Sequence, residues 1–146
     1  MPKLAAATGL QQMRAIVEGT APPAPIQALI GFVLAEIDEG TAVFLCTPTA
    51  EMRNPLGAVH GGIAMTLLDS AAGAAVHTTL GAGQAYATLE TKVNLVRAIT
   101  PETGEVRAEG EVVYRGGRVA TAQGRLTDRT GALLAHATST CLILGG

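Results

Sequence analysis

Asp69 is the only charged residue in residues 54–89, a stretch built mainly from small and apolar residues. Within it, residues 60–77 predict a helix that is buried around most of its circumference. A carboxylate in such a helix costs free energy of desolvation unless the site uses it. Gly61 and Gly62 stand where this helix would begin, and their backbone N–H groups would have no partner inside the helix. An exposed helix N-terminus and a buried acid together suit the hydrolysis of a carbonyl compound.

The spacing of these two groups predicts a shared site. Water adding to a carbonyl makes an oxyanion, which needs hydrogen-bond donors where the charge appears. The Gly61 N–H is such a donor, favoured by the helix dipole and by the absence of a Cβ. Asp69 follows eight residues later, about 12 Å along the axis at about 1.5 Å per residue. Reacting atoms must approach to about 3.5 Å, so the acid must come from a second copy of the chain, across a twofold axis.

Other chemistries are less well supported by the same residues. Ser70 follows Asp69, but no G-x-S-x-G motif surrounds it, and adjacent helix residues point about 100° apart. His77 and His136 have no partner at metal-ligand spacing from His60. We therefore expect neither a serine triad nor a metal site, and we interpret His77 and His136 as structural positions.

Composition indicates one globular domain spanning residues 1–146. The chain is 48% hydrophobic and 15% charged, which excludes disorder and allows one sizeable core. Its net charge of −2 argues against a nucleic-acid partner. With two Phe, two Tyr and no Trp, the core must consist of aliphatic residues. Sparse charge beside abundant apolar area suggests that another subunit covers part of the surface.

The expected location is the cytoplasm. Cys46 and Cys141 are too few for a disulfide framework and lie in apolar runs, so we interpret them as core residues of a reducing compartment. The first ten residues lack the sustained apolar segment of a signal peptide. Polar residues, Asp69 among them, make residues 60–80 unsuitable as a membrane helix. We expect a soluble protein without a membrane partner.

The first half of the chain predicts a lead-in, a hairpin and the long helix. Residues 1–30 form the lead-in, with an amphipathic helix over 8–18, a break at the prolines of 20–25 and a short turn at 26–30. The hairpin comprises residues 32–38 and 41–47. A loop over 48–59 precedes the helix, which we expect to run to about Leu80 and to be closed by Gly81 and Gly83.

The second half predicts four strands at a period of two. Their ranges are 86–98, 105–115, 118–128 and 133–144, joined by short turns. In the second of them, every other residue from Val106 to Tyr114 is uncharged, and the residues between them are mainly charged. Tyr114 is therefore expected on the apolar face. Strands joined by short turns pair antiparallel. One long apolar helix can be covered only by a sheet that curls around it, which makes this an α+β fold.

This architecture resembles the hotdog fold, and specifically the PaaI-type acyl-CoA thioesterases, over roughly residues 30–144. The most specific part is Asn54-Pro-Leu-Gly-Ala-Val-His60-Gly61-Gly62, with Asp69 nine residues beyond His60. Residues 88–94 and the hairpin 114–118 resemble later parts of the family with moderate specificity. The family fold is a curved antiparallel sheet wrapped around one long central helix.

The resemblance implies roles for particular residues. Gly61 would supply the backbone donor, flanked by Asn54 and His60. Asp69 would act as general base or nucleophile, and Thr88 would help to hold the water. Each has a competing structural role, as a loop-capping side chain for Asn54, a helix-terminal hydrogen-bonder for His60 and a strand former for Thr88. The family is dimeric with shared sites and often tetrameric, so a homodimer or homotetramer is expected.

Coenzyme A is part of the substrate in this family, so no separate cofactor is expected. The resemblance places its contacts near residues 95–97 and 115–119, which gives Arg97, Arg115, Gly117, Arg118 and Val119 as candidates. Guanidinium groups at strand ends and hairpins can meet phosphates, although a solvated charged turn would look the same. We expect the acyl group in an aliphatic pocket, lined by Met65 and Leu68 of the helix and by Met52 and Leu56 of the loop.

Two other functions stay open. A hotdog dehydratase acting on hydroxyacyl thioesters would also pair a His with an acid, although such enzymes do not usually carry His-Gly-Gly in this setting. A non-catalytic acyl-CoA-binding protein would bind the same ligand without hydrolysis. Water addition to an enoyl-CoA would distinguish the first alternative, and ligand binding without turnover the second.

Overall fold

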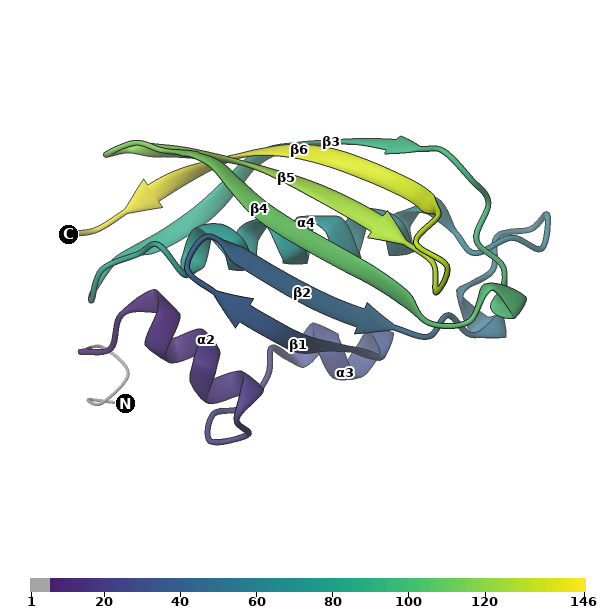
Figure 1. The fold of residues 1–146 in the computed structure, drawn as a ribbon, viewed down its shortest axis with the longest axis horizontal. Helices are drawn as coiled ribbons and strands as arrows, with labels where there is room; N and C mark the ends of the chain where they lie inside the picture. The colour runs from purple at the N-terminus through teal and green to yellow at the C-terminus, as the bar shows by residue number, and fades with distance from the viewer. Residues whose placement is uncertain (1–5) are drawn as a thin grey trace.

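The computed structural model describes residues 6–146 and shows one long helix enclosed by a curved sheet (Figure 1). The first five residues of the predicted lead-in lie outside the described residues. The helices are α2 (Gly9–Val17), α3 (Pro25–Ile30) and α4 (Gly61–His77), with short 3-10 turns at η1 (Ala50–Met52) and η2 (Pro101–Thr103). The strands are β1 (Phe32–Asp38), β2 (Thr41–Cys46), β3 (Ala85–Leu95), β4 (Val106–Arg115), β5 (Val119–Thr127) and β6 (Leu133–Leu144).

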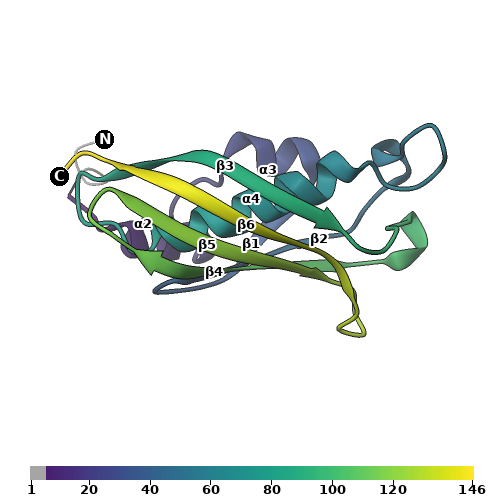
Figure 2. The ribbon, with the colours of Figure 1, turned by 90° about the horizontal axis from the view of Figure 1, so that it is seen from above.

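All six strands form one antiparallel sheet in the order β1-β2-β4-β5-β6-β3. The sheet curves around α4, which lies along its concave side, while α2 and α3 lie near the β1 end (Figures 1 and 2). The predicted hotdog architecture is confirmed. It leaves β1 and β3 as the two edge strands, so each has one side without a strand partner within the described chain.

One connection differs from the sequence-based expectation. We expected each of the last four strands to lie beside the next, and β4, β5 and β6 do so. However, β3 pairs with β6, and β4 pairs with β2. The segment between β3 and β4 therefore crosses the end of the molecule. Short turns predict local pairing, but this segment of residues 96–105 is long enough to reach another strand.

Close packing of small residues holds α4 against the sheet. Six successive positions, residues 71–76, are buried. Gly110 of β4 faces them so closely that a Cβ there would lie 2.1 Å from the carbonyl oxygen of Ala71. No side chain fits at that distance, so glycine is required at this crossing. The core is mainly aliphatic, as predicted, with Phe32 and Phe44 meeting edge-to-face at its β1–β2 end.

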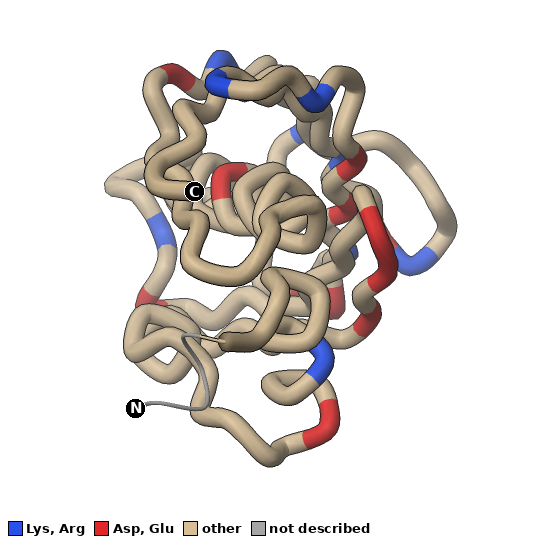
Figure 3. The backbone as a smooth tube through the Cα atoms, turned by 90° about the vertical axis from the view of Figure 1, so that its left-hand side faces the viewer, with Lys and Arg blue, Asp and Glu red and all other residues tan. Residues whose placement is uncertain are grey.

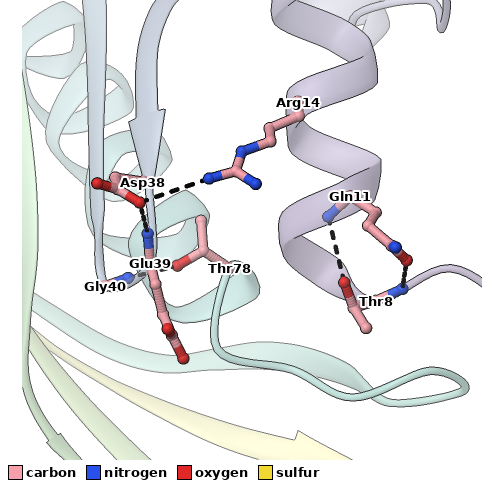
Figure 4. A network of polar contacts seen from close by, with 7 residues as sticks. All are labelled: Thr8, Gln11, Arg14, Asp38, Glu39, Gly40 and Thr78. Carbon is pink, nitrogen blue, oxygen red and sulfur yellow. Dashed lines mark hydrogen bonds and ion pairs between the residues drawn. The ribbon is translucent and has the colours of Figure 1, made fainter.

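Polar contacts attach the lead-in and the C-terminal end of α4 to the β1–β2 hairpin (Figure 4). Thr8 caps α2, in a capping box with Gln11. Arg14 lies 3.6 Å from Asp38 at the end of β1, an exposed ion pair. The N–H of Gly40 in the hairpin turn donates to the Thr78 hydroxyl at 2.7 Å. The hairpin therefore contacts α2 through Arg14 and the C-terminal cap of α4 through Thr78.

Three local predictions were wrong. Residues 25–30 form the helix α3 rather than a turn, because Pro25 occupies its first position, where its ring favours helical φ. The long helix ends at His77 with Thr78 as its cap, earlier than Leu80. Tyr114 faces outward and is 63% exposed, because a register shift between Val112 and Tyr114 breaks the alternation of β4.

Two further expectations concern the cysteines and a membrane-spanning helix. Cys46 and Cys141 are free and buried, as predicted. No helix of residues 6–146 is long and apolar enough to cross a membrane.

Candidate active site

The helix α4 begins at a capped N-terminus built by His60. Its imidazole Nδ1 accepts a hydrogen bond from the Gly62 N–H at 2.9 Å. Because Nδ1 accepts, the ring N–H lies at Nε2. His60 therefore has the helix-capping role that competed with a catalytic one, and its Nε2–H stays available to a ligand.

Only one of the two expected backbone donors is free. The Gly62 N–H is taken by His60, whereas nothing in residues 6–146 accepts from the Gly61 N–H. The sequence could not distinguish these two glycines, because the difference depends on the direction of the His60 ring. A single N–H thus stands at the positive end of the α4 dipole, open to a developing oxyanion.

Asn54 builds the loop that leads to this N-terminus. Its Oδ1 accepts from the backbone N–H groups of Leu56 and Ala58, at 2.9 and 3.2 Å. Its own backbone N–H donates to the Ala58 carbonyl at 2.7 Å. The side-chain oxygen is thereby committed to the loop. The Asn54 amide NH₂ has no acceptor within the described part of the chain and can donate to a ligand.

A hollow of about 240 Å³ brings the first group of predicted residues together. Asn54, His60 and Gly61 line it on one side, and the segment after β3, including Arg97, lines the other. The structure thus places one predicted CoA-binding arginine beside the three residues of the helix N-terminus. The pKa of the Asp128 carboxyl is lowered, mainly by its hydrogen bond from the Thr130 hydroxyl. The nearby Arg97 guanidinium makes a smaller contribution in the same direction.

Asp69 lies elsewhere, half-buried between α4 and β3. Its Oδ1 accepts from two threonine hydroxyls of β3, Thr88 at 3.1 Å and Thr91 at 3.3 Å. Thr88 was predicted and Thr91 was not. Charged residues of the chain lie mostly on the strands and turns (Figure 3), and Asp69 is the only one in α4. Asp69 was expected to be buried, and within one copy it is only partly so.

A β-bulge explains why both threonines reach the same carboxylate. Residues three apart in a regular strand point to opposite faces of the sheet. The register of β3 against β6 shifts between Thr88 and Glu90, which adds one residue there. Thr88 and Thr91 therefore both face α4. Alternation in the sequence gives no sign of this bulge, so Thr91 could not be found from the sequence.

The two groups are separate within one copy. Gly61 starts α4 and Asp69 lies eight residues further, about 12 Å along the axis. Asp69 does not line the hollow at Gly61. Within one chain the free Gly61 N–H and the Asp69 carboxylate are therefore too far apart to act on the same carbonyl.

The second group of predicted CoA contacts forms the β4–β5 hairpin. Gly117 and Arg118 are its turn, closed by a hydrogen bond from the Gly116 N–H to the Val119 carbonyl at 2.8 Å. Arg118 and Val119 are exposed. In contrast, the Arg115 guanidinium is already engaged within the chain.

Arg115 ties the hairpin to the end of α4. It donates to the Thr79 hydroxyl at 3.0 Å and to the Gln84 Oε1 at 3.2 Å, and it also contacts the Gly116 carbonyl. These bonds give Arg115 a structural role beside the predicted one. Among the hairpin arginines, Arg118 is the one whose guanidinium has no partner in residues 6–146.

Tyr86 is a further polar residue beside Asp69 that the sequence did not indicate. It lies two residues before Thr88 on β3, and a Cβ on Gly73 would lie 2.4 Å from its hydroxyl. Burial, with a smaller contribution from the Asp69 charge, raises the pKa of Tyr86 to about 12. The hydroxyl therefore stays protonated and can donate a hydrogen bond across the ordinary pH range.

Within one copy, the residues predicted to line the acyl pocket lie in different surroundings. Leu68 is fully buried in the core, and Leu56 is 93% exposed on its loop. Met52 lines a hollow beside α3 instead. The sequence could identify apolar residues near the motif, but not which of them face a cavity. Concerning metals, no group of three His, Cys, Asp or Glu residues gathers in the described chain.

Comparison with known proteins decides the family. The family model described as "Thioesterase superfamily" matches residues 56–135, which include the α4 N-terminus, Asp69 and most of the sheet. The chain belongs to the thioesterase superfamily. The predicted resemblance is thereby confirmed, as is the expectation of an enzyme of the thioesterase class.

Individual relatives and solved structures are consistent with this family assignment. A 1,4-dihydroxy-2-naphthoyl-CoA hydrolase of Listeria monocytogenes is 26% identical over 109 residues, 75% of this chain and 87% of the relative. A putative thioesterase from Ralstonia eutropha, a phenylacetic acid degradation-related protein, superposes with a TM-score of 0.81 at 28% identity, covering 90% of this chain and 98% of that one. The E. coli PaaI protein shares the fold, with a TM-score of 0.82 at 20% identity over 95% of this chain and 98% of its own.

Proposed function

We propose that this chain hydrolyses acyl-CoA thioesters to a free acid and CoA, at sites shared between two copies. One observation carries the proposal: a free Gly61 N–H begins the helix on which two threonines hold Asp69. These are the donor and the base that thioester hydrolysis needs. The named hydrolase relative supports a CoA thioester as the substrate class.

The proposed reaction uses Asp69 as general base. A water held by Asp69 and Thr88 gives a proton to the carboxylate as its oxygen bonds to the thioester carbonyl carbon. The carbonyl oxygen becomes an oxyanion, stabilised by the Gly61 N–H of the other copy, with the Asn54 amide and the His60 Nε2–H as adjacent donors. Collapse of this intermediate breaks the C–S bond. The CoA thiolate leaves and takes up the proton, which restores the Asp69 carboxylate.

The β3 edge is the surface on which a second copy would complete the site. This strand has no partner on its outer side within the described chain, and it carries the exposed apolar residues Leu89 and Leu95. Pairing of β3 with its twofold-related copy would satisfy the free edge and set the two α4 helices antiparallel. Asp69 of one copy would then approach Gly61 of the other.

Phosphate recognition is proposed for two arginines. Arg97 lines the hollow at Gly61, and Arg118 is exposed at the β4–β5 turn. Both lie beside β6, Arg97 bonded to Leu134 through its backbone and Arg118 to Ile143. These positions are about 30 Å apart at about 3.4 Å per residue. One CoA that contacts both an Arg97 and an Arg118 must therefore either extend along the sheet of one chain or take the two contacts from different subunits.

Thiol release from a panel of acyl-CoA esters tests the proposed function. The wild type should release CoA, and Asp69→Asn, which keeps the side-chain volume, should reduce turnover by roughly 10²-fold or more while retaining acyl-CoA binding. Asp38→Asn is a matched control, because this exposed carboxylate lies at the end of β1. Wild-type turnover in Asp69→Asn would contradict the mechanism. Hydration of an enoyl-CoA, or binding of acyl-CoA without hydrolysis, would instead support the dehydratase or the binding protein.

A further inference from the structure

A second hollow begins at Ser70, the residue after Asp69 on α4. It has a volume of about 220 Å³ and lies among α2, α3, α4 and the start of β3. Ser70, which follows Asp69, lines it, as does Tyr86, whose hydroxyl lies against Gly73. Ala74, which lies about 7.5 Å further along the axis than Asp69 at about 1.5 Å per residue, lines it too. An acyl group whose carbonyl lies near Asp69 could therefore extend its far end into this hollow.

The walls of this hollow are mostly apolar. They include Met13 and Ile16 of α2, Phe32 and Phe44 of the hairpin, and Ala74 of α4. A dry cavity of about 150 Å³ can hold one benzene molecule, so this hollow is suited to a compact acyl group rather than a long straight chain. The α2–α3 lead-in thus forms one wall of a pocket beside the acid.

Gln27 of α3 is a buried amide at this hollow. It is only 8% exposed, one of three buried polar residues in the described chain. Its Oε1 accepts from the Ala24 N–H at 3.2 Å, whereas its Nε2 has no acceptor in residues 6–146. Gln27 lines both this hollow and the larger one beside it. The side chain with the unused amide NH₂ therefore borders both hollows.

Two hydroxyls add to this surplus of donors. Neither Tyr86 nor Ser70 makes a side-chain hydrogen bond to any described residue, and both line the hollow. The remaining polar side chain there, His77, is already bonded to Gln12 at 2.8 Å, and burial lowers its pKa, so it stays neutral. No carboxylate or cationic side chain lines the hollow. The pocket is thus apolar and uncharged, with unused donors at Gln27, Tyr86 and Ser70.

We infer that this hollow is the acyl pocket and that it selects a compact acyl group carrying a neutral oxygen acceptor about four or five atoms from the thioester carbonyl. The inference rests on the proposed function for the position of that carbonyl. A plain hydrocarbon of the same shape would leave the three donors unpaired, which costs binding free energy. Gln27 and Tyr86 are then specificity-determining residues.

Isosteric ester pairs test this inference. In 5-oxohexanoyl-CoA and 5-methylhexanoyl-CoA an oxygen replaces a methyl group at the same branch, and 4-oxopentanoyl-CoA and 4-methylpentanoyl-CoA shift that branch by one carbon. Binding is measured by titration calorimetry on Asp69→Asn, so that hydrolysis does not interfere, and turnover on the wild type. We expect the oxo ester of at least one pair to bind roughly tenfold more tightly than its methyl partner.

Two variants assign the preference to the pocket. In the Asp69→Asn background, Gln27→Leu and Tyr86→Phe should each reduce the oxo-to-methyl binding ratio by roughly threefold or more. Gln123→Leu and Tyr114→Phe make the same chemical changes on the outer face of the sheet and at the hairpin, and should leave the ratio unchanged. Equal affinities within both pairs, or a ratio that survives both pocket variants, would overturn the inference.

The proposed function fails by a different result. If the wild type binds these esters with an oxo preference but hydrolyses none of them, the pocket is correctly assigned and the hydrolysis is wrong. If it hydrolyses oxo and methyl esters alike and binds them alike, hydrolysis stands and the selectivity is refuted.

Discussion

Leu95 of β3 lies directly against Gly61, and a Cβ on Gly61 would be 2.7 Å from the Leu95 Cδ1 atom. The free donor at the start of α4 is therefore walled on one side by the end of the edge strand. Leu95 is 53% exposed, so its side chain can turn away, whereas an added methyl would occupy the space through which the carbonyl approaches in the proposed mechanism. Because of this contact, the role of Gly61 can be tested by adding a single methyl group at that position.

Gly61→Ala should lower kcat by roughly 10²-fold without lowering the melting temperature, because helices tolerate alanine better than glycine. Gly81→Ala, where a Cβ meets nothing closer than 3.5 Å, is the matched control. The double variant Gly61→Ala/Leu95→Ala separates two causes of the loss. Recovery of activity there would attribute the loss to the displaced leucine, and continued loss would attribute it to the blocked carbonyl.

His60→Ala should retain part of the turnover. The His60 ring caps the Gly62 N–H, so its removal should destabilise the protein by about 1 kcal/mol, as the loss of a helix cap does. The Gly61 donor stays in place. Kinetics and urea unfolding measured on the same sample decide the matter. Complete inactivity of His60→Ala beside an unaffected Gly61→Ala would exchange the two roles and favour the dehydratase.

Mixed dimers should recover activity from two inactive parents. Asp69→Asn lacks the base and Gly61→Ala lacks an accessible donor, so a heterodimer contains one site with both groups intact. After subunit exchange, activity should rise toward a quarter of the wild-type value for a statistical mixture, because half of the dimers have one of two sites. The exchange is verified by native mass spectrometry. Verified heterodimers without turnover would show that the two groups do not meet across the subunits.

The hairpin arginines should differ in what they affect. Arg118→Ala should raise KM for CoA esters by about tenfold with little change in kcat, because a phosphate contact remote from the carbonyl contributes uniform binding. Arg115→Ala should instead lower the melting temperature, since its guanidinium holds Thr79 and Gln84. Pantetheine thioesters, which lack the nucleotide, are the control substrates. Equal wild-type KM values for both ester types would argue against the Arg118 contact.

Stability should fall on acidification because of His77. Burial lowers the pKa of His77 in the folded protein, so the unfolded chain takes up the proton first as the pH drops below about 6.5. The His77 contribution is therefore fully present above that pH and is lost as the pH falls through the folded value. Urea unfolding at about pH 7.5 and pH 5.5 should show a smaller difference for His77→Gln than for the wild type. An identical difference in both proteins would contradict this.

Much of the fold and half of the site could be predicted from the sequence, because they depend on local periodicity and spacing. The mainly small and apolar run whose only charge is Asp69 specifies a helix largely covered by the sheet, and the eight-residue separation of Asp69 from Gly61 predicts a site shared with a second subunit. Changes of period from 3.6 to 2 locate the strands. The motif from Asn54 to Gly62 identifies the helix N-terminus.

Tertiary structure alone decided which of these groups remain available for chemistry. The His60 ring takes the Gly62 N–H and leaves that of Gly61 free. A bulge in β3 turns Thr91 toward Asp69. Folding of the lead-in over α4 places Gln27 beside residues more than forty positions away, with its amide oxygen bonded to Ala24 and its amide NH₂ unpaired. Each outcome depends on the direction of a side chain, on the register of paired strands or on the packing of distant segments. The local pattern of hydrophobic and polar residues encodes none of these.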